Sequence, residues 1–189
     1  MSVTPVLKKL EHFFVTQQSI AFSLLQNGIS RAEIDEMKKA LNLSFPPEVY
    51  ELFEWKNGIR DLSKITIGAS LLFRWGAMVP FDQFIEVYHA SQKAKSYPNH
   101  YFPIFTNGGG DYILVNCNKD DAFYGYLYWH SPALYGTELD ARYTSLSTLL
   151  ECVLECFEAG GYYFESGIFE EDSDLSDPIL DKYELQEEE

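Results

Sequence analysis

The sequence lacks long apolar runs, and it is poor in cysteine. No stretch reaches the roughly 18 consecutive apolar residues that a membrane-spanning helix requires, so we expect no insertion into a membrane. The three cysteines are odd in number and do not form a disulfide framework, which favours reduced thiols in the cytoplasm. Cys152 and Cys156 lie four residues apart on a helical pattern, but a zinc site needs four ligands at suitable spacing. We therefore expect no metal.

Positive charge is also scarce. The chain has 14 lysines and arginines against 29 aspartates and glutamates, and its formal net charge is −15. Phosphate groups need a positive surface, so we expect no nucleic-acid binding. An acidic surface accelerates the encounter with a basic protein, which favours a partner of that kind.

The negative charge is concentrated towards the C-terminus. Residues 165–189 hold eleven acids, and Lys182 is their only base. We therefore predict a single domain over residues 1–164, followed by an acidic C-terminal tail over residues 165–189. Two interpretations of the tail stay open, because it can attract a basic partner or simply keep the protein in solution.

The hydrophobic pattern predicts helices first, a meander of strands in the middle and a helix near the end, which is typical of an α+β protein. The three central strands follow one another closely, and such short connections favour antiparallel pairing. Helices are expected over residues 4–28, 31–41, 46–57, 83–95 and 147–159, and strands over residues 71–81, 100–106, 111–117, 124–130 and 162–164.

A proline-led segment over residues 45–58 predicts one of these helices in detail. Pro46 and Pro47 suit a first helical turn, where a missing N–H costs nothing. Asn57 and Gly58 follow the last apolar residue, and glycine can take the left-handed conformation that ends a helix.

A run of three glycines before Asp111 resembles a phosphate-binding loop at first sight. Such a loop lies between a strand and a helix, with a lysine or a wider glycine spacing. Here Gly109 and Gly110 lead into a strand and no lysine follows. The segment therefore favours a hairpin turn in which glycines supply positive φ and Asp111 caps loop amides.

Catalytic residues do not form a complete set. Asp111, His130 and Ser131 include the residue types of a hydrolytic triad, but no nucleophile elbow surrounds Ser131, and Pro132 follows it. Trp129 and His130 at a strand end are more simply cross-strand positions. We expect no catalytic residue and no cofactor.

Aromatic residues are abundant, with 13 tyrosines, 14 phenylalanines and three tryptophans. Tyr124, Tyr126 and Tyr128 alternate along one predicted strand, with Trp129 next to them. Tyrosine and tryptophan dominate binding hot spots, so these four are our candidate partner-binding residues. The alternative is a sheet face that is only partly covered by aromatic rings.

The two motifs, in this order, resemble the signature of the SUKH superfamily over about residues 30–160. That superfamily includes the fungal regulator of cell-wall glucan synthesis and many bacterial toxin-immunity proteins. Two departures are Ile59, where many members have glycine, and Val115–Asn116, where the family has Leu-Asp. The residues that carry the resemblance, to which it implies a structural role, are Pro46, Tyr50, Phe53, Asn57, Gly58, Gly109, Gly110 and Asp111.

The resemblance implies a non-enzymatic binding domain, an antiparallel sheet wrapped by N-terminal and C-terminal helices. From it we expect an immunity protein that neutralises a cognate toxin by occlusion, with a basic toxin domain as partner. A regulatory scaffold that binds signalling proteins is the alternative, and an enzyme of unknown type is the third hypothesis.

Overall fold

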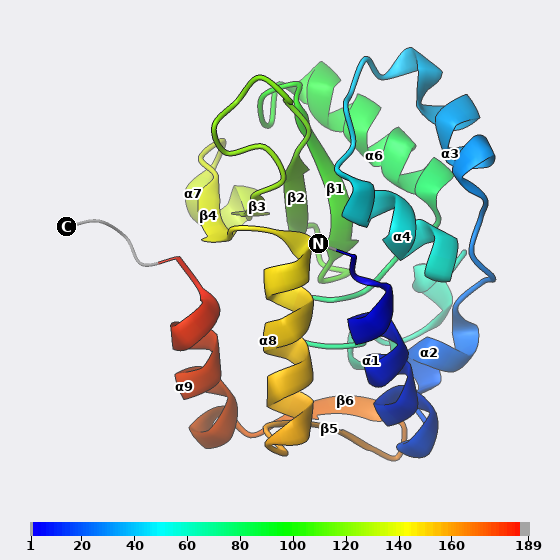
Figure 1. Cartoon of the computed structure of the whole chain (residues 1–189), viewed down its shortest axis with the longest axis vertical. Helices are drawn as coiled ribbons and strands as arrows, with labels where there is room; N and C mark the ends of the chain where they lie inside the picture. Colours follow the sequence, from blue (N-terminus) through cyan, green and yellow to red (C-terminus); the bar gives the residue numbers. More distant parts are fainter. Residues whose placement is uncertain (1, 186–189) are drawn as a thin grey trace.

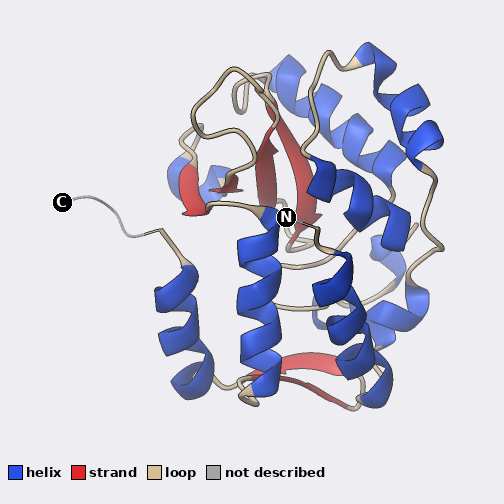
Figure 2. Ribbon diagram, in the orientation of Figure 1, coloured by secondary structure: helices blue, strands red, loops and turns tan. Residues whose placement is uncertain are grey.

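The computed structural model describes residues 2–185 as an α+β fold (Figures 1 and 2). The helices and strands are, in chain order, α1 (Thr4–Thr16), α2 (Ile20–Leu24), α3 (Arg31–Met37), α4 (Pro47–Trp55), α5 (Ile67–Ser70), α6 (Phe81–Ala94), β1 (Tyr101–Thr106), β2 (Tyr112–Asn116), β3 (Leu127–His130), α7 (Pro132–Tyr135), β4 (Asp140–Tyr143), α8 (Leu146–Glu158), β5 (Tyr162–Glu165), β6 (Ile168–Glu171) and α9 (Ser173–Tyr183), with two short 3-10 turns at Lys38–Ala40 and Leu62–Lys64. No helix in this part of the chain has the length and apolar character needed to cross a bilayer.

Four strands form one sheet in the order β1-β2-β3-β4, and each neighbouring pair is antiparallel. The predicted meander is therefore confirmed, and β4 adds a strand that the sequence did not predict. Because β3 begins at Leu127, Tyr124 and Tyr126 lie in the turn before it and do not alternate along one strand. Trp129 is paired with Ile113 of β2 and points to the opposite face from Tyr128.

Helices cover the sheet and supply most of the core. α1 lies beside α8, and α6 packs against β1 (Figure 1). At the centre, four phenylalanine rings stack edge to face, with centroids 4.8 Å apart for one pair and 4.9 Å for another. We call this group the buried aromatic cluster; its members are Phe45, Phe53, Phe81 and Phe102.

The first predicted helix was too long. α1 ends at Thr16, Gln18 takes a left-handed conformation with φ of 56°, and the Ser19 hydroxyl accepts a hydrogen bond from the Phe22 amide to begin α2. Polar residues at this junction interrupt the apolar stripe. The prediction missed the break because apolar residues recur at helical spacing on both sides of it. A capping box opens α3, since the Glu33 carboxylate accepts a hydrogen bond from the Ser30 amide at 2.7 Å.

Residues 71–81 were also wrongly predicted as a strand. The segment turns sharply at Trp75, which has φ of 63°, and pairs with the sheet only at Ala77, opposite Thr106. The Trp75 ring stacks on Trp129, with centroids 4.4 Å apart. The segment is apolar because its aromatic and aliphatic side chains are buried, although its backbone does not form a strand.

Most of the acidic segment after residue 164 is built into the fold. β5 and β6 form a hairpin, and α9 packs on α8 (Figure 1). Leu180 of α9 is buried, and Arg74 Nε donates to Glu171 at 2.9 Å. Acids that look like solvated tail residues in the sequence therefore pair with bases from distant parts of the chain.

Candidate protein-binding groove

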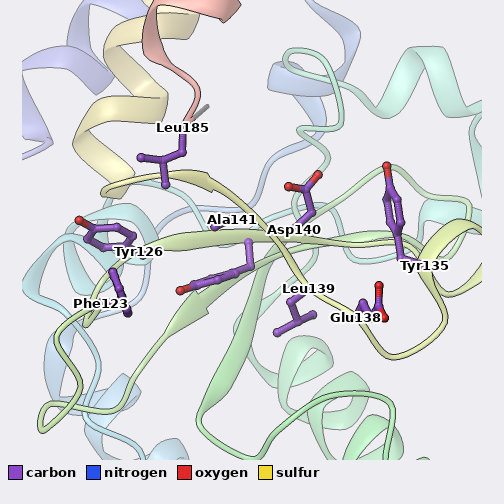
Figure 3. A pocket seen from close by; sticks show the side chains of 9 residues that line it. Phe123, Tyr126, Tyr135, Glu138, Leu139, Asp140, Ala141 and Leu185 are labelled. Carbon is purple, nitrogen blue, oxygen red and sulfur yellow. The ribbon is translucent and has the colours of Figure 1, made fainter. Parts of the chain in front are cut away.

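A hollow of about 670 Å3 lies on the surface beside β3 and β4 (Figure 3). Aromatic and aliphatic side chains form most of its walls, and two carboxylates contribute to its rim. We call it the aromatic groove; it is lined by Phe123, Tyr126, Tyr128, Tyr135, Glu138, Leu139, Asp140, Ala141 and Leu185.

The floor of the aromatic groove is formed by paired residues of β3 and β4. Tyr128 of β3 is paired directly with Ala141 of β4, so the two side chains share one face of the sheet. Tyr128 is half-buried, and its ring meets Tyr101 edge to face with centroids 4.9 Å apart. Burial is the main cause that raises the pKa of Tyr128, so its hydroxyl stays neutral at physiological pH. The methyl side chain of Ala141 leaves the space that the groove occupies.

One wall comes from the turn before β3. The Asp121 carboxylate accepts hydrogen bonds from the Phe123 amide at 2.9 Å and from the Asn116 side chain at 3.0 Å. The Phe123 ring then meets Tyr126 edge to face, with centroids 5.2 Å apart. These contacts hold Phe123 in place although 52% of it is exposed.

The opposite wall is α7 and the loop that follows it. The Tyr135 amide donates to the Ser131 carbonyl at 2.9 Å, and the Glu138 amide donates to the Tyr135 carbonyl at 3.1 Å. The buried His130 imidazole hydrogen-bonds to the backbone of Glu138, whereas its Nδ1 has no partner in residues 2–185. Burial lowers the pKa of His130, so the neutral form supports this wall.

Residues 184 and 185, which follow α9, close one end of the aromatic groove. The Leu185 amide donates to the Arg142 carbonyl on β4 at 2.8 Å. The Arg142 guanidinium donates to Glu184 at 2.7 Å and pairs with Asp140 at 2.6 Å. The segment after α9 is thereby attached to the sheet edge, and the apolar Leu185 side chain reaches the groove (Figure 3).

The structure brings together only two of the four predicted partner-binding residues. Tyr126 and Tyr128 line the aromatic groove, while Tyr124 lies at a separate hollow of about 240 Å3 beside Pro46. Trp129 is 5% exposed and stacks on Trp75, so its ring is covered within the domain.

Several groove residues were missed by sequence reasoning. Phe123 and Tyr135 are separated by 12 positions and lie outside any strand, so no periodic pattern connects them. A usable signal was the apolar, aromatic Ala-Leu-Tyr after Pro132, in a segment otherwise rich in turn residues.

The glycine-rich loop is a hairpin turn, with a different capping residue from the one predicted. Gly108 and Gly110 have positive φ. The Asn107 side-chain oxygen accepts from the Gly109 amide at 2.7 Å and from the Asp111 amide at 3.1 Å. Asp111 in turn accepts from the Asn107 side chain at 2.7 Å. Asn107 therefore caps the loop amides, and Asp111 holds Asn107.

The residues of the proline-led motif lie in or beside α4. Phe53 is fully buried, Pro46 is the N-cap, and the Tyr50 hydroxyl donates to Asp35 at 2.7 Å. The side-chain oxygen of Asn57 accepts the Phe81 amide at 2.9 Å, which links this motif to the start of α6.

Gly58 was predicted to end α4, and this prediction is wrong. The cap residue after the helix is Lys56, which is extended. Gly58 has φ of 69°, and a Cβ there would lie 2.3 Å from the Val79 carbonyl carbon. The requirement for glycine therefore comes from close backbone approach as well as from the left-handed conformation.

The residue types considered for catalysis serve other contacts. Asp111 holds Asn107, and the His130 ring packs against Tyr97 with centroids 5.0 Å apart. Among residues 2–185, no three His, Cys, Asp or Glu side chains gather as a metal site would require. Cys117, Cys152 and Cys156 are all buried free thiols.

Comparison with known proteins gives one family. Residues 28–152 match the family described as SMI1 / KNR4 family (SUKH-1). This range begins three residues before α3 and ends within α8, and it contains both motifs and the aromatic groove except Leu185. No curated protein matches the chain.

Proposed function

The chain belongs to the SMI1 / KNR4 family (SUKH-1), and from this premise we propose that it is an immunity protein that binds a cognate toxin and neutralises it by occlusion. The superfamily includes immunity proteins and regulators, and its members act through protein binding rather than catalysis. We propose the same for this chain, with no catalytic step of its own and with the cytoplasm as its compartment.

The observation that carries the proposal is a concentration of exposed apolar side chains at the aromatic groove. Leu134, beside the groove on α7, is 72% exposed, and Phe123 and Tyr135 are 52% and 42% exposed. Exposed apolar patches rimmed by polar groups mark interaction surfaces in soluble proteins. Half-buried tyrosines beneath them supply the rigid aromatic area on which binding hot spots depend.

Charge supports a basic partner. The chain carries a formal net charge of −15, and Glu138 and Asp140 lie at the groove itself. A basic surface would be attracted to this face before contact. We expect the association rate constant to fall about tenfold or more between low and high salt if this steering is strong.

The test is affinity capture from the native cell with three baits. They are the unaltered chain, Tyr126→Ala in the groove, and Tyr163→Ala as a matched control, since Tyr163 is an exposed tyrosine on β5. We expect one partner that the unaltered chain and the Tyr163 variant retain and the Tyr126 variant loses. Co-expression should then protect cells from that partner's toxicity.

Two outcomes would reject the proposal. A partner that is harmless when expressed alone would exclude the immunity role. Several weak partners, in place of one tight partner, would instead identify a regulatory scaffold of the kind that binds signalling proteins.

A further inference from the structure

We propose that the aromatic groove binds an extended segment of the partner that carries arginine, with the guanidinium stacked on the groove rings and paired with Glu138. This inference rests on the proposed protein-binding function and specifies the chemistry of its ligand. It depends on where this chain places cations over its other rings, on the lack of a cation over the groove rings, and on the shape of the hollow.

The chain places its own cations over several other rings. The Arg31 guanidinium carbon lies 4.5 Å from the centroid of the Tyr50 ring, and Arg31 also pairs with Glu54 at 3.4 Å. Lys182 lies 4.8 Å from the Tyr183 centroid and pairs with Glu155 at 2.7 Å. A ring face with a carboxylate beside it is therefore a recurrent cation site on this surface.

Arg74 makes a third case of the same arrangement. Its guanidinium carbon lies 5.8 Å from the Trp75 ring centroid, and its nitrogens donate to Glu171 and Asp177, each at 2.9 Å. In all three cases a cation of the chain itself lies over the ring and also pairs with an acid.

The aromatic groove has the rings and the acid but no cation. Among residues 2–185, no lysine or arginine lies over the rings of the groove, and no base pairs with Glu138. Arg142 is adjacent on β4, but Asp140 and Glu184 already hold its guanidinium. The position that a cation fills in the other three cases is therefore left for a partner.

Arginine fits this site better than lysine. Its planar guanidinium stacks on aromatic faces and is less strongly hydrated than an ammonium group, so it loses less on entering an apolar hollow. It can also present two parallel N–H donors to one carboxylate while it stacks. Glu138 is exposed and lines the same groove as the rings, on the wall that also carries Tyr135, so a carboxylate and ring faces are both available.

The shape of the groove favours an extended segment. Its volume of about 670 Å3 falls within the range of roughly 300–1,000 Å3 that drug-sized ligands occupy. It lies along the edge strand β4, over Ala141, between walls from the turn before β3 and the loop after α7 (Figure 3). A hollow of this volume beside an edge strand accommodates a few residues of an extended chain.

The experiment uses short acetylated peptides and the full chain labelled with ¹⁵N. One peptide alternates arginine with valine, a second replaces each arginine with lysine, and a third replaces each with glutamine. Amide chemical shifts measure both affinity and location. We expect the arginine peptide to bind about fivefold more tightly than the lysine peptide, the glutamine peptide to bind far more weakly, and shifts to concentrate at Tyr126, Tyr128 and Ala141.

A pair of variants tests the role of the carboxylate. Glu138→Gln should reduce affinity for the arginine peptide about fivefold, while Glu170→Gln, an exposed acid on β6, should leave it unchanged. Equal affinity for the arginine and lysine peptides, shifts away from the groove, or an unaffected Glu138 variant would overturn the inference.

Failure of this inference and failure of the proposed function are separable. If capture identifies a toxin that Tyr126→Ala loses, yet arginine peptides do not bind, the immunity role stands and the ligand chemistry is wrong. If arginine peptides bind at the groove but no toxin is captured, the site stands and the immunity role is wrong.

Discussion

The buried aromatic cluster and the aromatic groove are built from the same residue types but differ in what covers them. Phe53 in the cluster is 0% exposed and meets Phe81 edge to face, whereas Phe123 in the groove is 52% exposed and meets a ring, Tyr126, that is itself only half-buried. Helices α4 and α6 enclose the first group. The second lies between two loops and an edge strand.

This difference shows that aromatic content has two separate uses in one small domain. The rings in the cluster stabilise the fold, because folding removes them from water. The rings in the groove are only partly covered by folding and keep part of their apolar area exposed for a partner. The distinction depends on neighbours in space, which the composition of either segment does not reveal.

The largest expected effect separates the two groups by stability. Phe53→Ala should lower the free energy of unfolding by about 3–5 kcal/mol, because a large cavity is left in the core. Phe123→Ala, the same chemical change at an exposed ring, should cost less than about 1 kcal/mol. Urea unfolding of both variants measures the difference, and equal losses would contradict the contrast drawn between the two groups.

The next effect concerns the acidic segment after residue 164, which its composition predicts to be a tail. Leu180→Ala should destabilise the protein by about 2–4 kcal/mol, since this side chain is buried between α9 and the domain. Leu175→Ala on the same helix is the control, because Leu175 is 46% exposed and should have almost no effect.

Removal of the whole segment extends that test. A chain that ends after Glu165 folds cooperatively if the residues beyond it form only a solvated tail. The packing of α9 and the pairing of Arg74 and Arg142 with acids beyond residue 165 predict the opposite. We expect a lower and broader thermal transition. An unchanged thermal transition would show that the segment after residue 165 is a tail that the fold does not need.

Substitutions in the groove should weaken binding and leave stability almost unchanged, the reverse of substitutions in the buried aromatic cluster. Tyr126→Ala should weaken affinity for the captured partner by about 2 kcal/mol while the unfolding curve stays within about 0.5 kcal/mol of the unaltered chain. Calorimetric titration of folded protein measures the affinity. Tyr163→Ala serves as the control at the far end of α8, and an equal loss there would show that the effect is not specific to the groove.

The smallest expected effect is a pH dependence that originates beneath the groove. Burial lowers the pKa of His130 below 6.5, while its contact with the Glu138 backbone and the charge of Asp111 act in the other direction. The unfolded chain therefore takes up a proton first, and stability should fall as pH decreases through 6.5 towards the lower folded value.

A variant isolates this contribution from the carboxylates. His130→Gln removes the titrating group, so its melting temperature should change less than that of the unaltered chain between about pH 7 and pH 5.5. Glu155 does not interfere in this window: hydrogen bonds from Lys182 and then Tyr183 lower its pKa below 4.5. Parallel curves for the two proteins would exclude His130 as the source.

Local signals in the sequence predicted much of the fold. Apolar spacing located α4, α6 and α8, and close-set aromatic and β-branched runs located β1, β2 and β3. β4 escaped prediction because Asp140, Ala141 and Arg142 have little intrinsic preference for strands and depend on pairing with β3. The strand predicted at residues 71–81 failed because burial, not pairing, accounts for its apolar residues.

The candidate site was predictable only in part. The tyrosine repeat indicated Tyr126 and Tyr128. Tyr124 lies outside the groove because β3 begins later than the pattern suggested, and Trp129 points to the other face because neighbouring residues of a strand alternate. Phe123, Tyr135 and Leu185 meet at the groove through sheet register and through the return of the chain after α9. Contacts between residues so far apart in the sequence produce no local pattern that a single sequence could reveal.

Hydrogen–deuterium exchange on the complex with the captured partner tests the central claim most directly, which is that the aromatic groove, and not the motif-bearing helix, is the binding surface. We predict new protection of amides in residues 123–128 and 135–142, with no change in residues 45–58 around α4. Protection confined to residues 45–58, or to the β5–β6 hairpin, would contradict the account.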